Sequence, residues 1–149
     1  MGMHSLTRQL PLRIPLGAFF LHSGLSKRGA DRSTAEGLHG FACTAYPFLK
    51  KLDAQPFVRL LSAGEILLGA ALLVPVVPAA VAGAGVSAFS LGTMGLYLSV
   101  PGMREEGSLR PTPDGLPLAK DVWMLGIGLS LMLDDLIERC RHRLLMPGS

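Results

Sequence analysis

Residues 57–100 read FVRLLSAGEILLGAALLVPVVPAAVAGAGVSAFSLGTMGLYLSV and carry the clearest structural signal in the chain. They contain two apolar runs, 57–77 and 79–100, which meet within the segment PVVP. Arg59 and Glu65 are the only charged residues of the first run, and the second run has none. A helix of about 20 residues crosses a bilayer core about 30 Å thick. The pattern therefore predicts two transmembrane helices joined as a tight antiparallel hairpin.

Two more apolar runs flank this hairpin, at residues 10–27 and 116–137. Only 17% of the 149 residues are charged, whereas an ordinary soluble domain has about 25%. The length is sufficient for one domain. We therefore predict an all-α integral membrane protein, with a single membrane domain over residues 1–149. Its four transmembrane helices are expected to form an antiparallel bundle.

The segment between the first two predicted spans, residues 31–53, has a different pattern. Its apolar residues recur at helical spacing with charged residues between them, which indicates an amphipathic helix on the membrane surface or capping the bundle. We expect Gly37, Gly40 and Pro47 to break this helix into pieces. The apolar positions are Ala35, Leu38, Phe41, Ala42, Ala45, Phe48, Leu49 and Leu52.

Small residues repeat along the predicted spans at the spacing that close helix packing requires. They lie on faces that we expect to meet other helices rather than lipid. These residues are Gly17 and Gly24 in the first span, Gly69 in the second, Ala84, Ala88 and Gly92 in the third, and Gly128 in the fourth.

The two cysteines, Cys43 and Cys140, form no CxxC pair, and the four-span topology places them on opposite sides of the bilayer. We therefore expect two unpaired thiols. The sequence has no Ser-His-Asp, P-loop or zinc-ligand spacing, and no haem, flavin or iron–sulfur motif. It also has no basic patch with interleaved aromatic residues, so we predict no nucleic-acid partner. These absences favour a protein without a catalytic residue, metal site or evident cofactor.

Ionisable residues within the predicted spans are candidates for function, because charges are costly in a membrane. The antiparallel order gathers most of them on the side that carries the loop between the first two spans. Glu65 is the deepest, about 12 Å from that side at about 1.5 Å per residue. We expect it to be buried with a basic partner among Lys27, Arg59, Lys120 and Arg104. The candidate ligand-binding residues are His22, Lys27, Arg59, Glu65, Lys120 and Asp121.

Three interpretations of this cluster remain open. It is an ion network that holds the helices together, a pocket for a quinone or a lipid headgroup, or a proton or solute pathway in which Glu65 carries the proton. A pocket of this kind would be roofed by the amphipathic segment. His22 has no second histidine at helical spacing, which favours an interfacial histidine over a metal or haem ligand.

Several short segments, in order along residues 10–137, resemble the DoxX family of small four-helix bacterial membrane proteins. They are RIPLGAFFLHSGLSK at 13–27, EILLG at 65–69, and Lys120 with Asp121 at the start of the last apolar run. The segments EGLHG at 36–40 and AYPFL at 45–49 are similar to an actinobacterial branch of that family.

The resemblance implies a multi-pass protein of the cell membrane with both termini in the cytoplasm, linked with membrane redox work. Some relatives are associated with thiosulfate and quinone oxidoreductase activity, and others with oxidative-stress complexes. The distribution of basic residues favours the opposite orientation, because five Lys and Arg lie on the side of the termini and nine on the other.

These observations lead to one expected function and two alternatives. We expect a non-catalytic accessory subunit of a membrane redox or envelope complex, with a quinone- or lipid-binding pocket in one leaflet. Its partners would be membrane lipids and other membrane protein subunits. The alternatives are a small proton-coupled solute transporter and a purely structural packing subunit.

Overall fold

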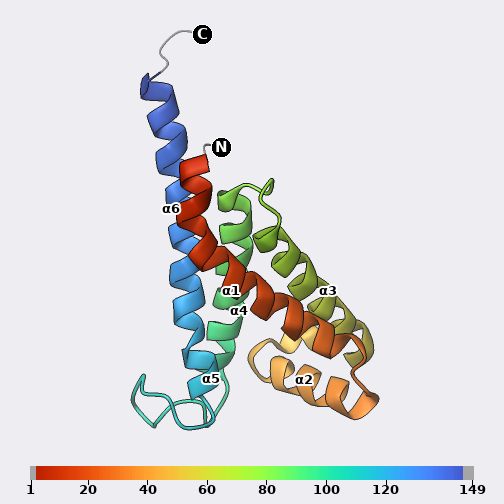
Figure 1. The fold of residues 1–149 in the computed structure, drawn as a ribbon. Helices are drawn as coiled ribbons and strands as arrows, with labels where there is room; N and C mark the ends of the chain where they lie inside the picture. The colour runs from red at the N-terminus through yellow and green to blue at the C-terminus, as the bar shows by residue number, and fades with distance from the viewer. Residues whose placement is uncertain (1–2, 146–149) are drawn as a thin grey trace.

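The computed structural model describes the backbone of residues 3–145 and the side chains of residues 7–141. Its long helices are α1 (Met3–Arg28), α3 (Ala54–Leu73), α4 (Ala79–Ser99) and α6 (Asp121–Leu145) (Figure 1). The shorter elements are α2 (Arg32–Ala45), the 3-10 helix η1 (Pro47–Lys51) and α5 (Leu116–Ala119). The regular elements in this part of the chain are all helical, as the sequence predicts.

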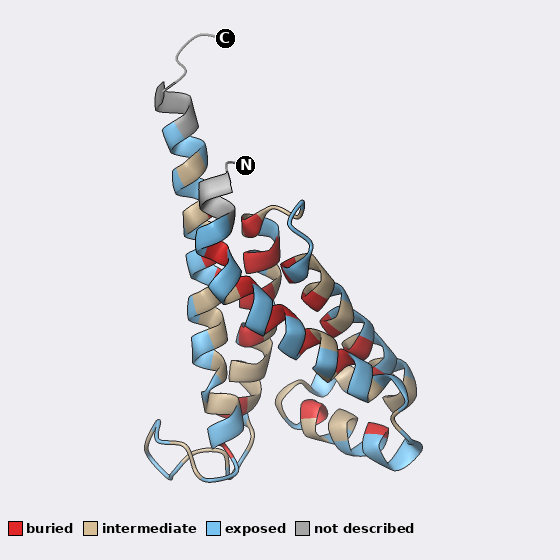
Figure 2. Cartoon of the chain, viewed as in Figure 1, coloured by how far each residue is buried: buried red, intermediate tan, exposed pale blue. Residues whose placement is uncertain are grey.

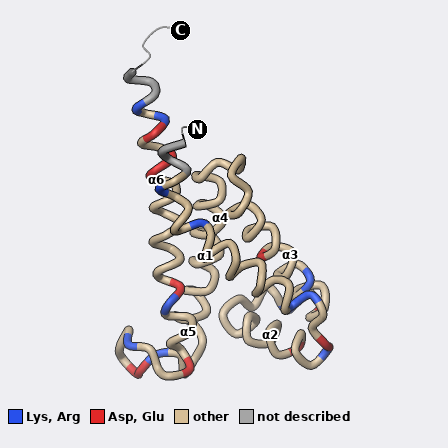
Figure 3. Tube along the Cα trace, viewed as in Figure 1, with Lys and Arg blue, Asp and Glu red and all other residues tan. Residues whose placement is uncertain are grey.

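Three helices in the described chain are long and apolar enough to cross a membrane, namely Ala54–Leu73, Ala79–Ser99 and Leu116–Arg141. They coincide with three of the four predicted spans. The remaining one, the first predicted span at 10–27, lies within α1, where Arg13, His22 and Lys27 dilute the apolar residues. Figure 3 shows the charged residues concentrated toward the ends of the helices.

The helices are arranged as two pairs, α1 with α3 and α4 with α6, each packed closely through glycines. A Cβ atom at Gly69 would lie 2.8 Å from the carbonyl oxygen of Gly17, and one at Gly24 would lie 2.8 Å from that of Ser62. Because these distances are shorter than any real contact of a Cβ atom, only glycine permits so close an approach of the helices. The predicted small-residue faces of the first two spans are thereby confirmed.

The packed face of α4 differs from the prediction. Gly83, rather than Ala84, meets α6, where a Cβ atom would lie 2.5 Å from the carbonyl oxygen of Gly128. Ala84 and Ala88 are exposed, and a Cβ atom at Gly92 would meet no other atom within 4 Å. The prediction of this face was wrong because small and apolar residues occur all around α4, so their spacing marks no single face.

The two pairs meet at one end and separate toward the other, where α2 lies (Figure 1). A core of apolar side chains joins the two pairs at the end where they meet. Buried residues are concentrated in this core and along the interface within each pair (Figure 2). The core comprises Leu16 and Phe20 of α1, Leu72 of α3, Ala79, Ala82 and Val86 of α4, and Leu131 of α6. The separation of the pairs leaves room for a cavity at the end that α2 occupies.

The amphipathic segment is helical, as predicted, and its apolar side faces the other helices through Ala35 and Ala42. Asp31 caps α2 by accepting a hydrogen bond from the backbone N–H of Thr34 at 3.0 Å. Hydrogen bonds from Thr34 lower the pKa of the Asp31 carboxyl below its ordinary value. The helix continues through Gly37 and Gly40 and ends at Ala45, two residues before Pro47, so the predicted breaks at the two glycines were wrong. Glycine only weakens a helix, whereas proline removes a hydrogen-bond donor.

Candidate functional site

A cavity of about 430 Å³ lies where the two helix pairs separate. Helix α2 and the η1 segment form one wall, and α1, α3, α4 and α5 form the others. Its lining is mostly apolar and consists of Leu38, Phe41, Ala42, Leu49, Phe57, Leu61, Ala88, Phe89, Gly92, Leu96 and Leu118. The remaining lining residues are Lys27, Tyr46, Glu65 and Thr93.

The strongest polar feature of this cavity is an ion pair between Lys27 of α1 and Glu65 of α3. Lys27 Nζ donates to Glu65 Oε2 at 2.9 Å and to Oε1 at 3.1 Å. The Glu65 side chain is 4% exposed and that of Lys27 is 20% exposed. The predicted burial of Glu65 with a basic partner is confirmed. Burial of a charged group is costly unless an opposite charge and hydrogen bonds accompany it, and Lys27 provides both for Glu65.

Neighbouring hydrogen bonds hold this ion pair in position. Lys27 Nζ also donates to Ser23 Oγ at 2.6 Å, one helical turn back on α1. Ser62, one turn before Glu65 on α3, donates its hydroxyl to the carbonyl oxygen of Gly24 at 2.7 Å. The close approach of the two helices at Gly24 makes the contact of Ser62 with α1 possible. The pair is therefore fixed on a rigid interface rather than on a loop.

Tyr46 closes the cavity between the α2 segment and α4. Its hydroxyl donates to the carbonyl oxygen of Gly92 at 2.7 Å. The absence of a side chain at Gly95 leaves the space that this hydroxyl occupies. The position of Tyr46, between α2 and η1, thus depends on the break that Pro47 introduces.

The other predicted site residues lie apart from the ion pair. Asp121 is half-buried and lies beside Thr93 of the cavity lining. His22 and Lys120 are exposed and do not line the cavity, and Arg59 is exposed on a separate groove formed by α1 and α3. The structure therefore brings Lys27 and Glu65 together, with Asp121 nearby, and separates the remaining three.

A contact that sequence reasoning missed links α2 to η1. His39 Nε2 lies 3.0 Å from the carbonyl oxygen of Leu49 and 3.3 Å from Cys43 Sγ. Because a carbonyl oxygen only accepts, the contact with Leu49 requires a hydrogen on Nε2, and that nitrogen then cannot take a proton from the thiol. His39 therefore acts as a structural link. The sequence signal for the contact between His39 and Cys43 was their four-residue spacing, which places them on the same face of a helix.

A second missed residue is Arg13, at the opposite end of the pair formed by α1 and α3. It is 2% exposed. Its Nε donates to the carbonyl oxygen of Leu72 at 2.7 Å. Its Nη2 donates to the carbonyl oxygens of Ala71, Val74 and Val77 at 2.9 to 3.1 Å. The guanidinium group thus caps the C-terminal carbonyls of α3, which lack partners within their own helix.

The thiols Cys43 and Cys140 are both unpaired, as predicted. In the described residues, no three His, Cys, Asp or Glu side chains lie close enough to hold a metal ion. Comparisons of the chain with protein-family models, with curated proteins and with solved structures found no match.

Proposed function

We propose that this chain is a DoxX-like membrane protein that binds a quinone or a lipid in the cavity beside α2. We assign it the role of a non-catalytic accessory subunit of a membrane redox or envelope complex. One observation carries the proposal: the buried Lys27–Glu65 ion pair lies on the wall of a cavity whose other lining residues are almost all apolar.

The size and lining of the cavity suit a ring that carries a polar oxygen. Small-molecule pockets measure about 300–1,000 Å³ and combine apolar walls with a few fixed polar groups. Phe41, Phe57 and Phe89 supply aromatic surface against which a flat ring packs. The Lys27–Glu65 ion pair supplies the charged part of the wall, which a quinone carbonyl or the ester oxygen of a lipid would face. The accessory role rests on the resemblance of residues 13–27 and 65–69 to DoxX segments.

The substitution Gly92→Leu tests this site. Gly92 lines the cavity and has open space where a side chain would begin, so a leucine would fill the cavity without displacing backbone. We expect the affinity for a short-chain ubiquinone analogue to fall about ten-fold or more, because overfilling a packed site costs about 1–3 kcal/mol. Equilibrium dialysis of the labelled analogue against protein in nanodiscs measures this change.

Gly64→Leu is the matched control for that substitution. Gly64 is also helical, also has open space around a new Cβ atom, and lies outside the cavity lining. It should leave quinone affinity and thermal stability unchanged. Equal quinone binding by the parent protein and Gly92→Leu would reject the cavity as the binding site.

A small proton-coupled transporter is the second candidate, favoured by the burial of the carboxylate Glu65 beside a cavity. This role requires a solute-dependent proton flux in liposomes that Glu65→Gln abolishes. Quinone binding that Gly92→Leu weakens, without any such flux, supports the accessory subunit. If the protein showed neither quinone binding nor a solute-dependent proton flux, the result would support a purely structural packing subunit.

The proposal includes a four-span topology in which α1 also crosses the membrane. Both ends of the chain lie at the same end of the helices, and α2 and the loop before α5 lie at the other (Figure 1). In a Cys43→Ser background, we expect Ser5→Cys and the native Cys140 to react with an impermeant maleimide from one side. Ser33→Cys and Glu106→Cys should react only from the opposite side.

These labelling positions separate the two possible topologies. Cys43 is replaced because it is buried, whereas Cys140, Ser33 and Glu106 are exposed. If the maleimide reacts with Ser5→Cys and Ser33→Cys from the same side, then α1 does not cross the membrane and the chain has three transmembrane helices.

A further inference from the structure

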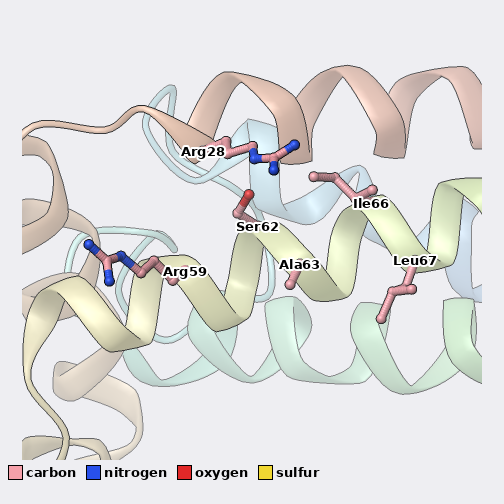
Figure 4. Close-up of a pocket in the computed structure, with 6 residues that line it drawn as sticks. All are labelled: Arg28, Arg59, Ser62, Ala63, Ile66 and Leu67. Atoms are coloured by element: carbon pink, nitrogen blue, oxygen red, sulfur yellow. The ribbon is translucent and has the colours of Figure 1, made fainter.

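A second groove, of about 510 Å³, runs along the outer face of the α1 and α3 pair and is distinct from the cavity beside α2. Arg28 of α1 and Arg59 of α3 lie near Ser62, at the end of the groove where α3 begins (Figure 4). Ala63, Ile66 and Leu67 continue the groove along α3. Its lining therefore has a cationic end and an apolar end.

The two arginines lack partners within the described residues. Neither makes an ion pair or a hydrogen bond with another side chain or with the backbone, and both are exposed. The groove lining itself contains no acidic residue. In Figure 4 the Arg28 guanidinium extends above Ser62 toward Ile66 and the Arg59 guanidinium points away from Ser62, so two cations from different helices line the same groove. The planar N–H fork of arginine suits the oxygens of a phosphate.

The apolar end is also oriented for a lipid. Arg59 lies near the beginning of α3, and Leu67, which is 70% exposed, lies eight residues farther along. At about 1.5 Å per residue, the groove descends about 12 Å from the arginines toward the middle of the helix. A charged headgroup and the first part of an acyl chain are separated in the same way across a membrane interface.

We infer that this groove binds an anionic phospholipid, with its phosphate at the end lined by Arg28 and Arg59 and one acyl chain along Ile66 and Leu67. An ordinary arginine at a membrane surface extends its side chain toward water and selects no lipid. Here two arginines from different helices, both without a partner in the described residues, line one groove together with Ala63, Ile66 and Leu67, so charge and apolar surface lie in a single binding site. This inference does not depend on the quinone cavity.

The test is native mass spectrometry of the full chain, released from detergent, with added phosphatidylglycerol or phosphatidylcholine. We expect the parent protein to retain phosphatidylglycerol preferentially. The double variant Arg28→Gln/Arg59→Gln should retain it about ten-fold less, since each basic residue near a membrane surface contributes an attraction to anionic lipid. Leu67→Asn, which keeps both arginines, should also weaken retention.

The control is Lys50→Gln/Lys51→Gln, which removes the same charge from exposed positions of η1, outside the groove. It should retain phosphatidylglycerol as the parent does, and so should Gly92→Leu. Equal loss in the lysine and arginine variants would overturn the inference, because net charge would then explain binding. Displacement of the lipid by an equal concentration of inorganic phosphate would also overturn it, since the groove would then be a site for the free ion.

Discussion

Arg13→Met should lower the thermal unfolding midpoint of the detergent-solubilised protein more sharply than replacement of any surface arginine. The Arg13 guanidinium is buried and donates to four backbone carbonyls at the end of α3 and in the turn that follows. Methionine fills a similar volume but removes the side-chain donor from all four oxygens, of which that of Val74 still accepts from the backbone N–H of Val77 at 3.2 Å. Hydrogen bonds to charged groups contribute about 1.5–3 kcal/mol each, and we expect a total loss of about 3–5 kcal/mol because the contacts are not additive.

Two further variants distinguish the capping role of Arg13 from its charge. Arg13→Lys keeps the charge but lacks the planar fork that reaches several carbonyls at once, so we expect an intermediate loss. Arg8→Met removes an arginine from the same helix whose side chain is 57% exposed and pairs with Asp134 at 2.9 Å. Its effect should be small, because exposed ion pairs contribute little. Equal midpoints for Arg13→Met and Arg8→Met would show that the α3 carbonyls are satisfied without Arg13.

Lys27→Met should produce the second large loss of stability, because it leaves the carboxylate of Glu65 buried and unpaired. Breaking a buried pair at one partner costs about 3–5 kcal/mol in soluble proteins. The double variant Lys27→Met/Glu65→Leu removes both charges and should recover most of that loss. Thermal unfolding of the parent, the two single variants and the double variant forms a complete cycle that isolates the pairwise interaction.

The control for this cycle is the ion pair between Arg32 and Glu36 on α2. Its atoms lie 2.8 Å apart, close to the distance in the Lys27–Glu65 pair, but its side chains are 87% and 57% exposed. Arg32→Met should therefore change the unfolding midpoint little, since water screens the charge that remains. If Lys27→Met and Arg32→Met behaved alike, water entering the cavity would be sufficient to solvate Glu65.

The sequence predicted the helices, and a buried Glu65 with a basic partner, for physical reasons that depend on local pattern. Long apolar runs bounded by prolines identify helices without knowledge of the fold. Glu65 lies within such a run and needs a cation, and Lys27 lies at a similar depth on the preceding span. Burial and charge were thus sufficient to predict a cation beside Glu65, with Lys27 as one of four candidates.

Other features depend on contacts that leave no mark in the sequence. The partners of Arg13 are backbone carbonyls, which every residue possesses, so the position of this arginine inside the first predicted span did not show which groups it binds. The packed face of α4 could not be identified because its residues are small or apolar on all sides. The exposure of His22 and Lys120 depends on helix rotation, which is determined by the glycine contacts of the two pairs.

The division of the chain into two helix pairs has a consequence for the order of synthesis. The first pair uses only residues before 74, and the second only residues after 78. Each half therefore contains its own principal interface, and the first is complete in sequence before the ribosome has made any of α4. Arg13 then receives its last acceptor, the carbonyl of Val77, as the linking turn emerges. Helices α1 and α3 can thus pack together early in synthesis. Helices α4 and α6 then pack against a pair that has already formed.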